Sequence, residues 1–363
     1  MGFGEAWKTR MGECSKETAF EILDYFTSQG GNFIDTANGY QAEESEIWLG
    51  EWMAARKNRD EIVLATKYSS SYKGHQKEKL QSNYGGNGTK SLRISFEQSL
   101  QKLQTNYIDL FYLHWWNYSV TIPELMHALN DLIVAGKIIY LDVSNTPAWV
   151  VAKANQYARD HGLRQFTVYQ GLWNASIRDF ERDIIPMCRD EGMGLLPYGT
   201  LGQGRFQSEA SFAEREKNIL GRKLKPYSSL DMSVSKVLEK IATAKGTDIT
   251  GIALAYVMHK APYVFPLIGC RKVEHLKGSI AALGLALSSE NISEVGKAYN
   301  FDPGFPHTFL SGTLFNDELQ PDVPHGPQDV WLTKLMGNFD WVESPKPLTP
   351  KSTSKVYMKI LEE

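Results

Sequence analysis

The sequence predicts an α/β fold with a parallel sheet, and two features of the chain support that prediction. Short runs of almost continuously apolar residues alternate with longer amphipathic segments. Such runs are typical of parallel strands that are covered on both faces, because neither face meets water. The runs are not joined by tight hairpin turns, so each strand should be followed by a crossover helix.

The apolar runs and the amphipathic segments follow one another in a regular order. The predicted strands cover residues 33–35, 62–67, 108–114, 138–145, 166–171, 194–199 and 265–269. The predicted helices cover residues 16–31, 43–56, 92–104, 122–137, 147–162, 179–192 and 272–284. Several of these helices end in Gly, a common stop signal because Gly tolerates a left-handed backbone.

This order of elements favours a single (β/α)8 TIM barrel over residues 1–302. A closed barrel of this kind has eight strands, and the predicted runs leave one strand missing. The missing strand should precede the first helix, where the chain reads "MGFGEAW". We therefore expect a barrel that lacks its first strand. Residues 303–363 are predicted to form a partly irregular tail that packs near the barrel mouth.

Two connections are too long to be plain turns, at residues 68–91 and 200–232. The loops that follow the strands of a barrel surround its site, so both connections are candidates for substrate and cofactor contacts. A disordered linker is the alternative interpretation, and it applies equally to the Pro-rich and Ser-rich residues 343–355.

The composition argues against several classes of partner. A formal net charge of −3 gives no sign of a nucleic-acid partner, and no apolar run reaches the ~18 residues of a membrane span. No residues have the spacing of metal ligands, and the odd cysteine set of Cys14, Cys188 and Cys270 favours a reducing compartment. We therefore expect a cytoplasmic protein without nucleic-acid, membrane or metal partners, and its oligomeric state is left open.

Four polar side chains stand at or just beyond the ends of the first three predicted strands. Asp35, Lys67 and His114 end these strands, and Tyr40 lies in the loop after Asp35. Parallel strands bring their carboxyl ends together, so we expect the four groups to converge. A carboxylate at the edge of a core is costly without a partner, and Lys67 is the predicted partner of Asp35.

These four residue types suit the reduction of a carbonyl group. A Lys ammonium beside a Tyr hydroxyl favours the tyrosinate, so it should lower the pKa of the phenol from about 10. The Asp holds the ammonium in place, and the His can donate a hydrogen bond to the carbonyl oxygen. No side chain transfers hydride, so a nicotinamide cofactor is implied.

Each of the four residues also has an ordinary structural interpretation. Asp35 could cap a helix, Lys67 could be a solvated strand end, His114 could be a satisfied core histidine, and Tyr40 could be a packed aromatic. Their joint placement at successive strand ends favours a site.

The segments that carry these residues resemble the aldo-keto reductases, and the resemblance covers nearly the whole chain. "NFIDTANGY", "IVLATK" and "IDLFYLHWW" are similar to the three catalytic segments of that family. The resemblance implies that Tyr40 is the acid/base, that Lys67 and Asp35 tune it, and that His114 orients the carbonyl. Longer strings such as "TPAWVVAKAN" and "KAPYVFPLIGCRKVEHLKGSI" resemble the fungal aryl-alcohol dehydrogenase and norsolorinic acid reductase subgroup.

The resemblance also implies NADPH (or NADP+) bound in an extended form across the barrel mouth. The residues implied at the nicotinamide are Ser144, Asn145, Gln170 and Tyr198. Those implied at the pyrophosphate are Gly199, Leu201, Gly204 and Arg205. Those implied at the 2′-phosphate are Gly269, Arg271, Lys272 and His275, with Arg271 foremost. Cations near a helix N-terminus suit a phosphate group.

The chain departs from the subgroup in four places. The subgroup normally has an N-terminal cap and the first barrel strand before "MGFGEAW". Asp142 stands where the family usually has Gly, and it is expected to add a charge near the nicotinamide. Tyr198 stands where the subgroup more often has Trp, and Ser279 replaces an Asn that commonly contacts the adenine.

Aromatic residues at the predicted barrel mouth suit a flat, apolar substrate, with core packing as the alternative for each ring. The predicted substrate-binding residues are Tyr68, Trp115, Trp116 and Trp173. With the resemblance, they imply NADPH-dependent, reversible reduction of an aromatic or polycyclic aldehyde or ketone in fungal secondary metabolism.

Two other functions compete with a carbonyl reductase. A non-catalytic or weakly active NADPH-binding barrel with a regulatory role would fit the missing strand and Asp142. A barrel hydrolase that uses Asp35 and a second carboxylate would leave Lys67 and Tyr40 without a purpose. The four catalytic residue types favour the reductase.

Overall fold

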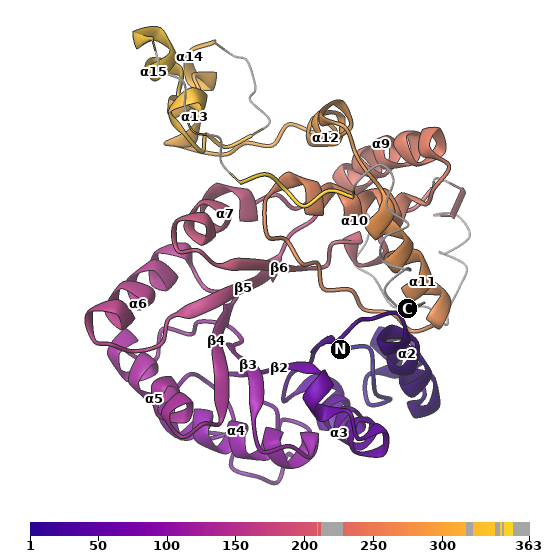
Figure 1. Ribbon diagram of the computed structural model, residues 1–363, viewed down its shortest axis with the longest axis vertical. Coiled ribbons are helices and arrows are strands. Elements are labelled where there is room, and N and C mark those ends of the chain that lie inside the picture. The colour runs from indigo at the N-terminus through magenta and orange to yellow at the C-terminus, as the bar shows by residue number, and fades with distance from the viewer. Residues whose placement is uncertain (209, 212–227, 317–321, 338–341, 343–344, 351–363) are drawn as a thin grey trace, which may run out of the picture.

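The fold is built on one curved, open sheet of six parallel strands, seen here in a computed structural model that describes residues 1–208, 210–211, 228–316, 322–337, 342 and 345–350. The strands are β1 Phe33–Asp35, β2 Val63–Tyr68, β3 Ile108–Leu113, β4 Ile138–Ser144, β5 Phe166–Leu172 and β6 Gly194–Tyr198. They pair in chain order, and every neighbouring pair is parallel. Figure 1 shows helices α3 to α7 along the outer side of this half-barrel.

Helices join the strands and continue beyond the sheet. The first of them are α1 Lys8–Met11, α2 Lys16–Ser28, α3 Glu44–Arg56, α4 Thr89–Leu103, α5 Ile122–Val134, α6 Ala148–Asp160 and α7 Phe180–Asp190. The later ones are α9 Ser229–Lys245, α10 Ile249–Lys260, α11 Val273–Ala281, α12 Ser289–Gly296, α13 His307–Leu310, α14 Thr313–Asn316 and α15 Trp331–Met336. Short 3₁₀ turns occupy Tyr40–Glu43, Arg59–Glu61, Gly202–Gly204, Ala282–Gly284 and Pro327–Asp329.

Local side-chain chemistry explains where several helices begin. The Ser15 side chain accepts a hydrogen bond from the Thr18 amide at the start of α2, and Thr121 does the same for Glu124 in α5. Ser228 caps α9 by accepting a hydrogen bond from the Asp231 amide. Such caps satisfy amide groups that the first helical turn leaves without partners.

The first six predicted strands are confirmed to within a residue at each end, and the seventh prediction is wrong. Residues 265–269 form no strand, and only an isolated bridge joins Val264 to Leu195 of β6. Three backbone hydrogen bonds still hold residues 263–267 beside β6. Pro266 and Pro197 explain the interruption, because neither has an amide hydrogen for a ladder.

Helices α9 and α10 were not predicted. Ser229, the first residue of α9, lies inside the loop predicted over residues 200–232, of which 209 and 212–227 are outside the described residues. Eight of the twelve residues of α10 are buried, and the apolar ones surround the helix rather than form one stripe. A helix of that kind has no amphipathic period for a pattern to reveal.

The described residues form an open sheet rather than the closed eight-stranded barrel implied by the resemblance. Residues 1–15 contain α1 and irregular backbone without a strand. Their backbone is held beside the start of α3, where the Ser45 hydroxyl donates to the Phe3 carbonyl and the Glu44 carboxylate accepts from the Glu5 amide. Figure 1 shows the N-terminus near the opening between β2 and α11.

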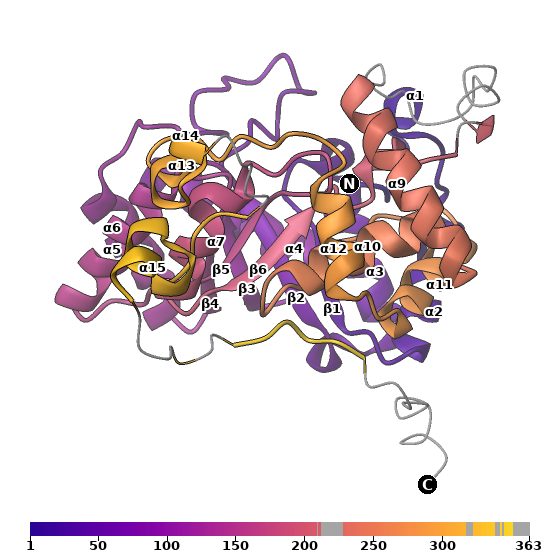
Figure 2. The same cartoon turned by 90° about the horizontal axis from the view of Figure 1, so that it is seen from above.

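One large apolar cluster runs between the sheet and its outer helices and includes Trp52, Phe96 and Phe111. Figure 2 shows α13, α14 and α15 grouped at one side of the molecule. Within the described part of the chain, no helix has the length and apolar character needed to cross a membrane.

Candidate active site

The carboxyl ends of β1 and β2 bring Asp35 and Lys67 into contact, as predicted. Lys67 Nζ lies 2.5 Å from Asp35 Oδ1 and donates a second hydrogen bond to the Thr36 carbonyl at 2.6 Å. Gln170 Nε2 donates to Asp35 Oδ2 at 2.9 Å. Both carboxylate oxygens of Asp35 are therefore occupied, which compensates for its partial burial.

Tyr40 lies beside this ion pair. Lys67 Nζ is 5.4 Å from the centroid of the Tyr40 ring, and the Tyr40 hydroxyl makes no hydrogen bond with the described residues. Burial, followed by the charge of Asp35, raises the pKa of Tyr40 above its ordinary value. Burial also lowers the pKa of Lys67. Burial and Asp35 therefore outweigh the lowering of the Tyr40 pKa expected from Lys67, and Tyr40 is a neutral phenol around pH 7.

His114 completes the group. Its ring meets that of Tyr40 edge to face, with the centroids 5.8 Å apart. Burial and the neighbouring Lys67 lower the pKa of His114 to about 3, so the imidazole is neutral around pH 7. The Ser70 hydroxyl lies 3.4 Å from Nδ1, and Nε2 has no hydrogen-bond partner among the described residues.

The backbone turns sharply after Tyr40 through three left-handed residues. Gln41, Ala42 and Glu43 have φ values of 52°, 51° and 83°. A residue with a side chain loses about 1–2 kcal/mol in this conformation, so surrounding contacts must hold the turn.

Two sets of contacts hold this left-handed turn. The Gln41 side chain accepts a hydrogen bond from the Trp7 amide at 2.6 Å and donates to the Met1 carbonyl at 3.0 Å. The buried Glu43 carboxylate pairs with Lys73 Nζ at 2.6 Å and with Lys102 Nζ at 3.0 Å. The chain's first residues and the loop after β2 thus both support the position of Tyr40.

The residues predicted at the nicotinamide lie beside this group, at the ends of β4, β5 and β6. Asn145 Nδ2 donates to Ser144 Oγ and to the His114 carbonyl at 2.9 and 3.1 Å, and its Oδ1 accepts from the Tyr198 hydroxyl at 3.0 Å. Gln170 reaches Asp35, as described above. The structure therefore brings these residues together with the catalytic candidates, while their cofactor contacts stay predictions.

The segment predicted to cover the pyrophosphate begins directly after β6. Gly199 and Gly204 have positive φ values of 69° and 89°, and Leu201 is half-buried between them. Arg205 is buried and its Nε lies 3.3 Å from Asp231 Oδ1 of α9. In this structure the Arg205 guanidinium thus faces a carboxylate rather than open space.

The segment predicted at the 2′-phosphate precedes and begins α11. Lys272 and His275 are exposed and Arg271 is half-buried. The charges of Arg271 and Lys272 both lower the pKa of His275, after burial, so the three side chains form one basic group. Gly269 has open space where a side chain would be. A phosphate dianion fits this place, because cations meet the unpaired amides of a helix N-terminus.

The four rings predicted at the substrate separate into two pairs. Trp115 is 38% exposed and Trp116 is half-buried in the loop after β3. Tyr68 and Trp173 are fully buried in the core, where Tyr68 stacks on Phe111 and Trp173 stacks on Phe180. The structure gives Tyr68 and Trp173 the packing role that was their alternative interpretation.

Asp142, which was expected to add a charge near the nicotinamide, is buried within the sheet. It is fully buried on β4 in register with Tyr112, and Thr167 Oγ1 donates to its Oδ1 at 3.0 Å. Burial raises the pKa of Asp142 well above its ordinary value. Burial thus favours the neutral form of this carboxyl, and no described cation pairs with it.

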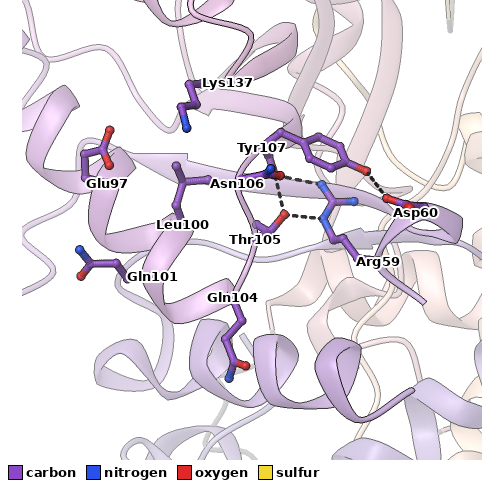
Figure 3. A pocket seen from close by; sticks show the side chains of 10 residues that line it. All are labelled: Arg59, Asp60, Glu97, Leu100, Gln101, Gln104, Thr105, Asn106, Tyr107 and Lys137. Atoms are coloured by element: carbon purple, nitrogen blue, oxygen red, sulfur yellow. Dashed lines mark hydrogen bonds between the residues drawn. The ribbon is translucent and has the colours of Figure 1, made fainter. Parts of the chain in front are cut away.

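A surface hollow lies at the other end of the sheet (Figure 3). Its lining residues Arg59, Tyr107 and Lys137 stand just before β2, β3 and β4. The Arg59 guanidinium is held by Thr105, by two backbone carbonyls and by Asp109. Because these contacts are internal and lie at the amino ends of the strands, we assign the hollow a structural role.

Sequence reasoning missed several residues around the site. Ser70, Glu43 and Lys102 contact the catalytic candidates or the turn that carries Tyr40. Ser70 could have been found, since it follows β2 by two residues. Glu43 and Lys102 stand on separate helical patterns, and no local signal links them.

Comparison with known proteins agrees with this geometry. The sequence model of the Aldo/keto reductase family matches residues 1–300 of the chain. A norsolorinic acid reductase B of Dothistroma septosporum is 67% identical over 350 residues, which cover 96% of this chain and 89% of that protein. A norsolorinic acid reductase B of Aspergillus parasiticus is 62% identical over 97% of this chain and 92% of its own length. An aryl-alcohol dehydrogenase of Pestalotiopsis microspora is 51% identical over 96% of this chain and 88% of its own length.

The chain belongs to the aldo/keto reductase family, and the protein is an oxidoreductase. Members of this family generally use NADP(H).

Proposed function

We propose that the protein reduces an aromatic or polycyclic aldehyde or ketone to the alcohol with NADPH, reversibly, in fungal secondary metabolism. The observation that carries this proposal is the neutral, unpaired Tyr40 hydroxyl beside the Asp35–Lys67 ion pair and a neutral His114. The names of the relatives, norsolorinic acid reductase and aryl-alcohol dehydrogenase, support an aromatic substrate.

Tyr40 supplies the proton in this proposal. The phenol keeps its proton at neutral pH, and it gives this proton to the carbonyl oxygen as negative charge develops there. Neutral His114 donates a hydrogen bond to the same oxygen through Nε2, which has no other described partner. Asp35 holds Lys67 beside the Tyr40 ring, where a positive charge would stabilise the tyrosinate that is left.

NADPH, when bound, supplies the hydride. The residues that would hold its nicotinamide are Ser144, Asn145, Gln170 and Tyr198, which already form one cluster with His114 and Asp35. Gly199, Leu201 and Gly204 would line the pyrophosphate. Arg205 would contact it after leaving Asp231, its partner in this structure. Arg271, Lys272 and His275 would hold the 2′-phosphate.

The aromatic substrate would lie over Trp115 and Trp116, the two predicted rings that are not buried in the core. Flat rings offer a large apolar area with little loss of side-chain freedom. We further propose that the sheet belongs to a (β/α)8 barrel and that the reaction takes place in the cytoplasm, where Cys14, Cys188 and Cys270 would stay reduced.

The experiment is NADPH oxidation, followed by its absorbance, with a panel of aryl aldehydes, aryl ketones and polycyclic ketones. We expect turnover with aromatic carbonyls and little with aliphatic ones of similar size. Binding of NADPH without turnover of any carbonyl would support the competing regulatory barrel and contradict the reductase.

A further inference from the structure

Arg271 is a cation without an internal partner. It lies between residues 263–267, which run beside β6, and α11, is half-buried, and makes no ion pair or hydrogen bond with the described residues. A half-buried guanidinium without a partner is costly unless a ligand supplies the anion. No hydrogen bond to the described residues orients the Arg271 guanidinium, so packing against its neighbours must set its orientation.

That packing is made by the backbone of Gly12. A β-carbon at Gly12 would lie 2.1 Å from Nη1 of Arg271, 2.7 Å from Cζ and 3.2 Å from Nε. These distances are below normal van der Waals contact, so the guanidinium fills the space that a side chain at position 12 would need. Gly12 ends α1 with φ of 81°, which also favours Gly.

The surrounding residues hold the two segments together. A β-carbon at Gly2 would lie 3.3 Å from the Cys270 carbonyl oxygen. Cys14 is buried with Leu276 of α11 in a small apolar cluster that Cys270 also joins. Residues 2–14 thus pack along residues 270–276, and Gly12 is the residue that contacts the guanidinium of Arg271.

We propose that Gly12 is a positioning residue that determines specificity for the 2′-phosphate of an adenine dinucleotide. The absence of its side chain lets the Arg271 guanidinium lie where a phosphomonoester can meet two of its N–H groups. The inference rests on the proposed function, which places the 2′-phosphate at Arg271. A methyl group at position 12 would push the guanidinium aside, and paired Arg–phosphate hydrogen bonds depend on geometry.

The test measures ligand binding without turnover. The dissociation constants of 2′,5′-ADP and of 5′-ADP are measured by calorimetry, and their ratio reports recognition of the 2′-phosphate alone. We expect Gly12→Ala to reduce the preference for 2′,5′-ADP by about tenfold, and Arg271→Ala by at least as much. Gly30→Ala is the matched control, because Gly30 has φ of 82° and nothing within 4 Å of its β-carbon position. It should leave the ratio unchanged.

The outcomes separate the role of Gly12 from the placement of the 2′-phosphate at Arg271. If Arg271→Ala abolishes the preference while Gly12→Ala keeps it, the role of Gly12 is overturned and the phosphate site stands. If Arg271→Ala itself keeps the preference, the 2′-phosphate lies elsewhere and both ideas are overturned. In the double variant, Gly12→Ala should have no further effect, because it acts through Arg271.

A folding measurement covers the case in which Gly12→Ala is unstable. Removing the guanidinium frees the space for the methyl group while the backbone strain at position 12 stays, so Gly12→Ala/Arg271→Ala should melt at a higher temperature than Gly12→Ala. A double variant as unstable as Gly12→Ala alone would show that the contact with Arg271 is not the cause, and it would overturn the inference.

Discussion

At the scale of single residues, burial sets the protonation state of the site. Tyr40 and Asp142 both have raised pKa values, and His114 has a lowered one, with burial as the largest cause in each case. Burial therefore favours the neutral form of all three groups. In the proposed reaction, the carbonyl oxygen of a substrate would meet the neutral Tyr40 and His114 as hydrogen-bond donors.

Replacing Tyr40 with Phe tests the proton donor. The change removes only the hydroxyl, so we expect kcat for carbonyl reduction to fall by about 100-fold or more, while the affinity for NADPH stays the same. Steady-state kinetics and cofactor fluorescence measure the two quantities. An unchanged kcat would rule out Tyr40 as the acid.

Replacing Asp142 with Asn tests its protonation. In the unfolded chain this carboxyl ionises above about pH 3.9, whereas in the fold its pKa is raised, so its contribution to stability is lost as pH rises. Asn cannot ionise and avoids that loss. We expect Asp142→Asn to raise the melting temperature at pH 7.5 by roughly 2 °C or more and to change it little at pH 4.

The exposed carboxylate of Asp131 provides the control for this change. It pairs with Arg93 on the surface, where both side chains are more than half exposed, and such pairs contribute about 0–1 kcal/mol. Asp131→Asn should leave the melting temperature nearly the same at both pH values. An equal response of the two variants would argue against a protonated Asp142.

At the scale of elements, the left-handed turn after Tyr40 links three parts of the chain. Gln41 binds the backbone of residues 1 and 7, and Glu43 binds Lys73 of the loop after β2 and Lys102 of α4. Strained backbone persists only where its surroundings determine it fully. The turn therefore makes the position of Tyr40 depend on contacts far from it in sequence.

Replacing Glu43 with Gln tests this dependence. It leaves Lys73 without its carboxylate and weakens the hold on the turn, so we expect a loss of about 1–3 kcal/mol in stability and a lower kcat. The KM for NADPH should change little, since Glu43 is not among the cofactor residues. Urea unfolding and steady-state kinetics give these values.

The matched control is Glu294→Gln, which removes a surface ion pair with Lys240. It should change the free energy of unfolding by no more than about 1 kcal/mol, and it should leave kcat unchanged. If Glu43→Gln lowers stability alone, with kcat at the wild-type level, the turn is not what positions Tyr40.

At the scale of the whole molecule, the parallel sheet gathers residues from six strands at one end and surrounds them with loops. Asp35, Lys67, His114, Ser144, Gln170 and Tyr198 stand at or next to the carboxyl ends of β1 to β6. The burial of His114 among them couples the stability of the fold to pH.

His114 should make stability fall in acid. The unfolded chain takes up a proton on this residue below its ordinary pKa of 6.5, while the folded protein does so only near pH 3. The folded state therefore loses stability as pH falls from about 6.5 towards 3. Between pH 7 and pH 4.5 we expect a loss of roughly 2 kcal/mol from this residue.

Urea unfolding of the wild type and of His114→Gln at several pH values checks this expectation. The variant should lose less stability than the wild type across the same range, because Gln does not titrate. Parallel curves for the two proteins would contradict the lowered pKa of His114.

The sequence by itself predicted much of the fold and of the site. The apolar runs located six strands, and the residues at three strand ends identified Asp35, Lys67 and His114. It was wrong about residues 265–269, where two prolines interrupt pairing, and it missed α10, whose buried surface has no period. Tyr68 and Trp173 were placed at the substrate because an aromatic residue near a strand end has the same pattern whether it is buried or exposed.

What the sequence determined is local: the order of strands and helices, their ends, and the kinds of side chain that follow each strand. Periodicity, caps and turns act over a few neighbouring residues, so they can be recognised in the chain. Only the tertiary structure decided the direction of the pKa shifts of Tyr40 and Asp142, the support of the turn at Glu43 and the contact of Gly12 with Arg271. These depend on burial and on distances between residues far apart in the chain, and no local pattern records them.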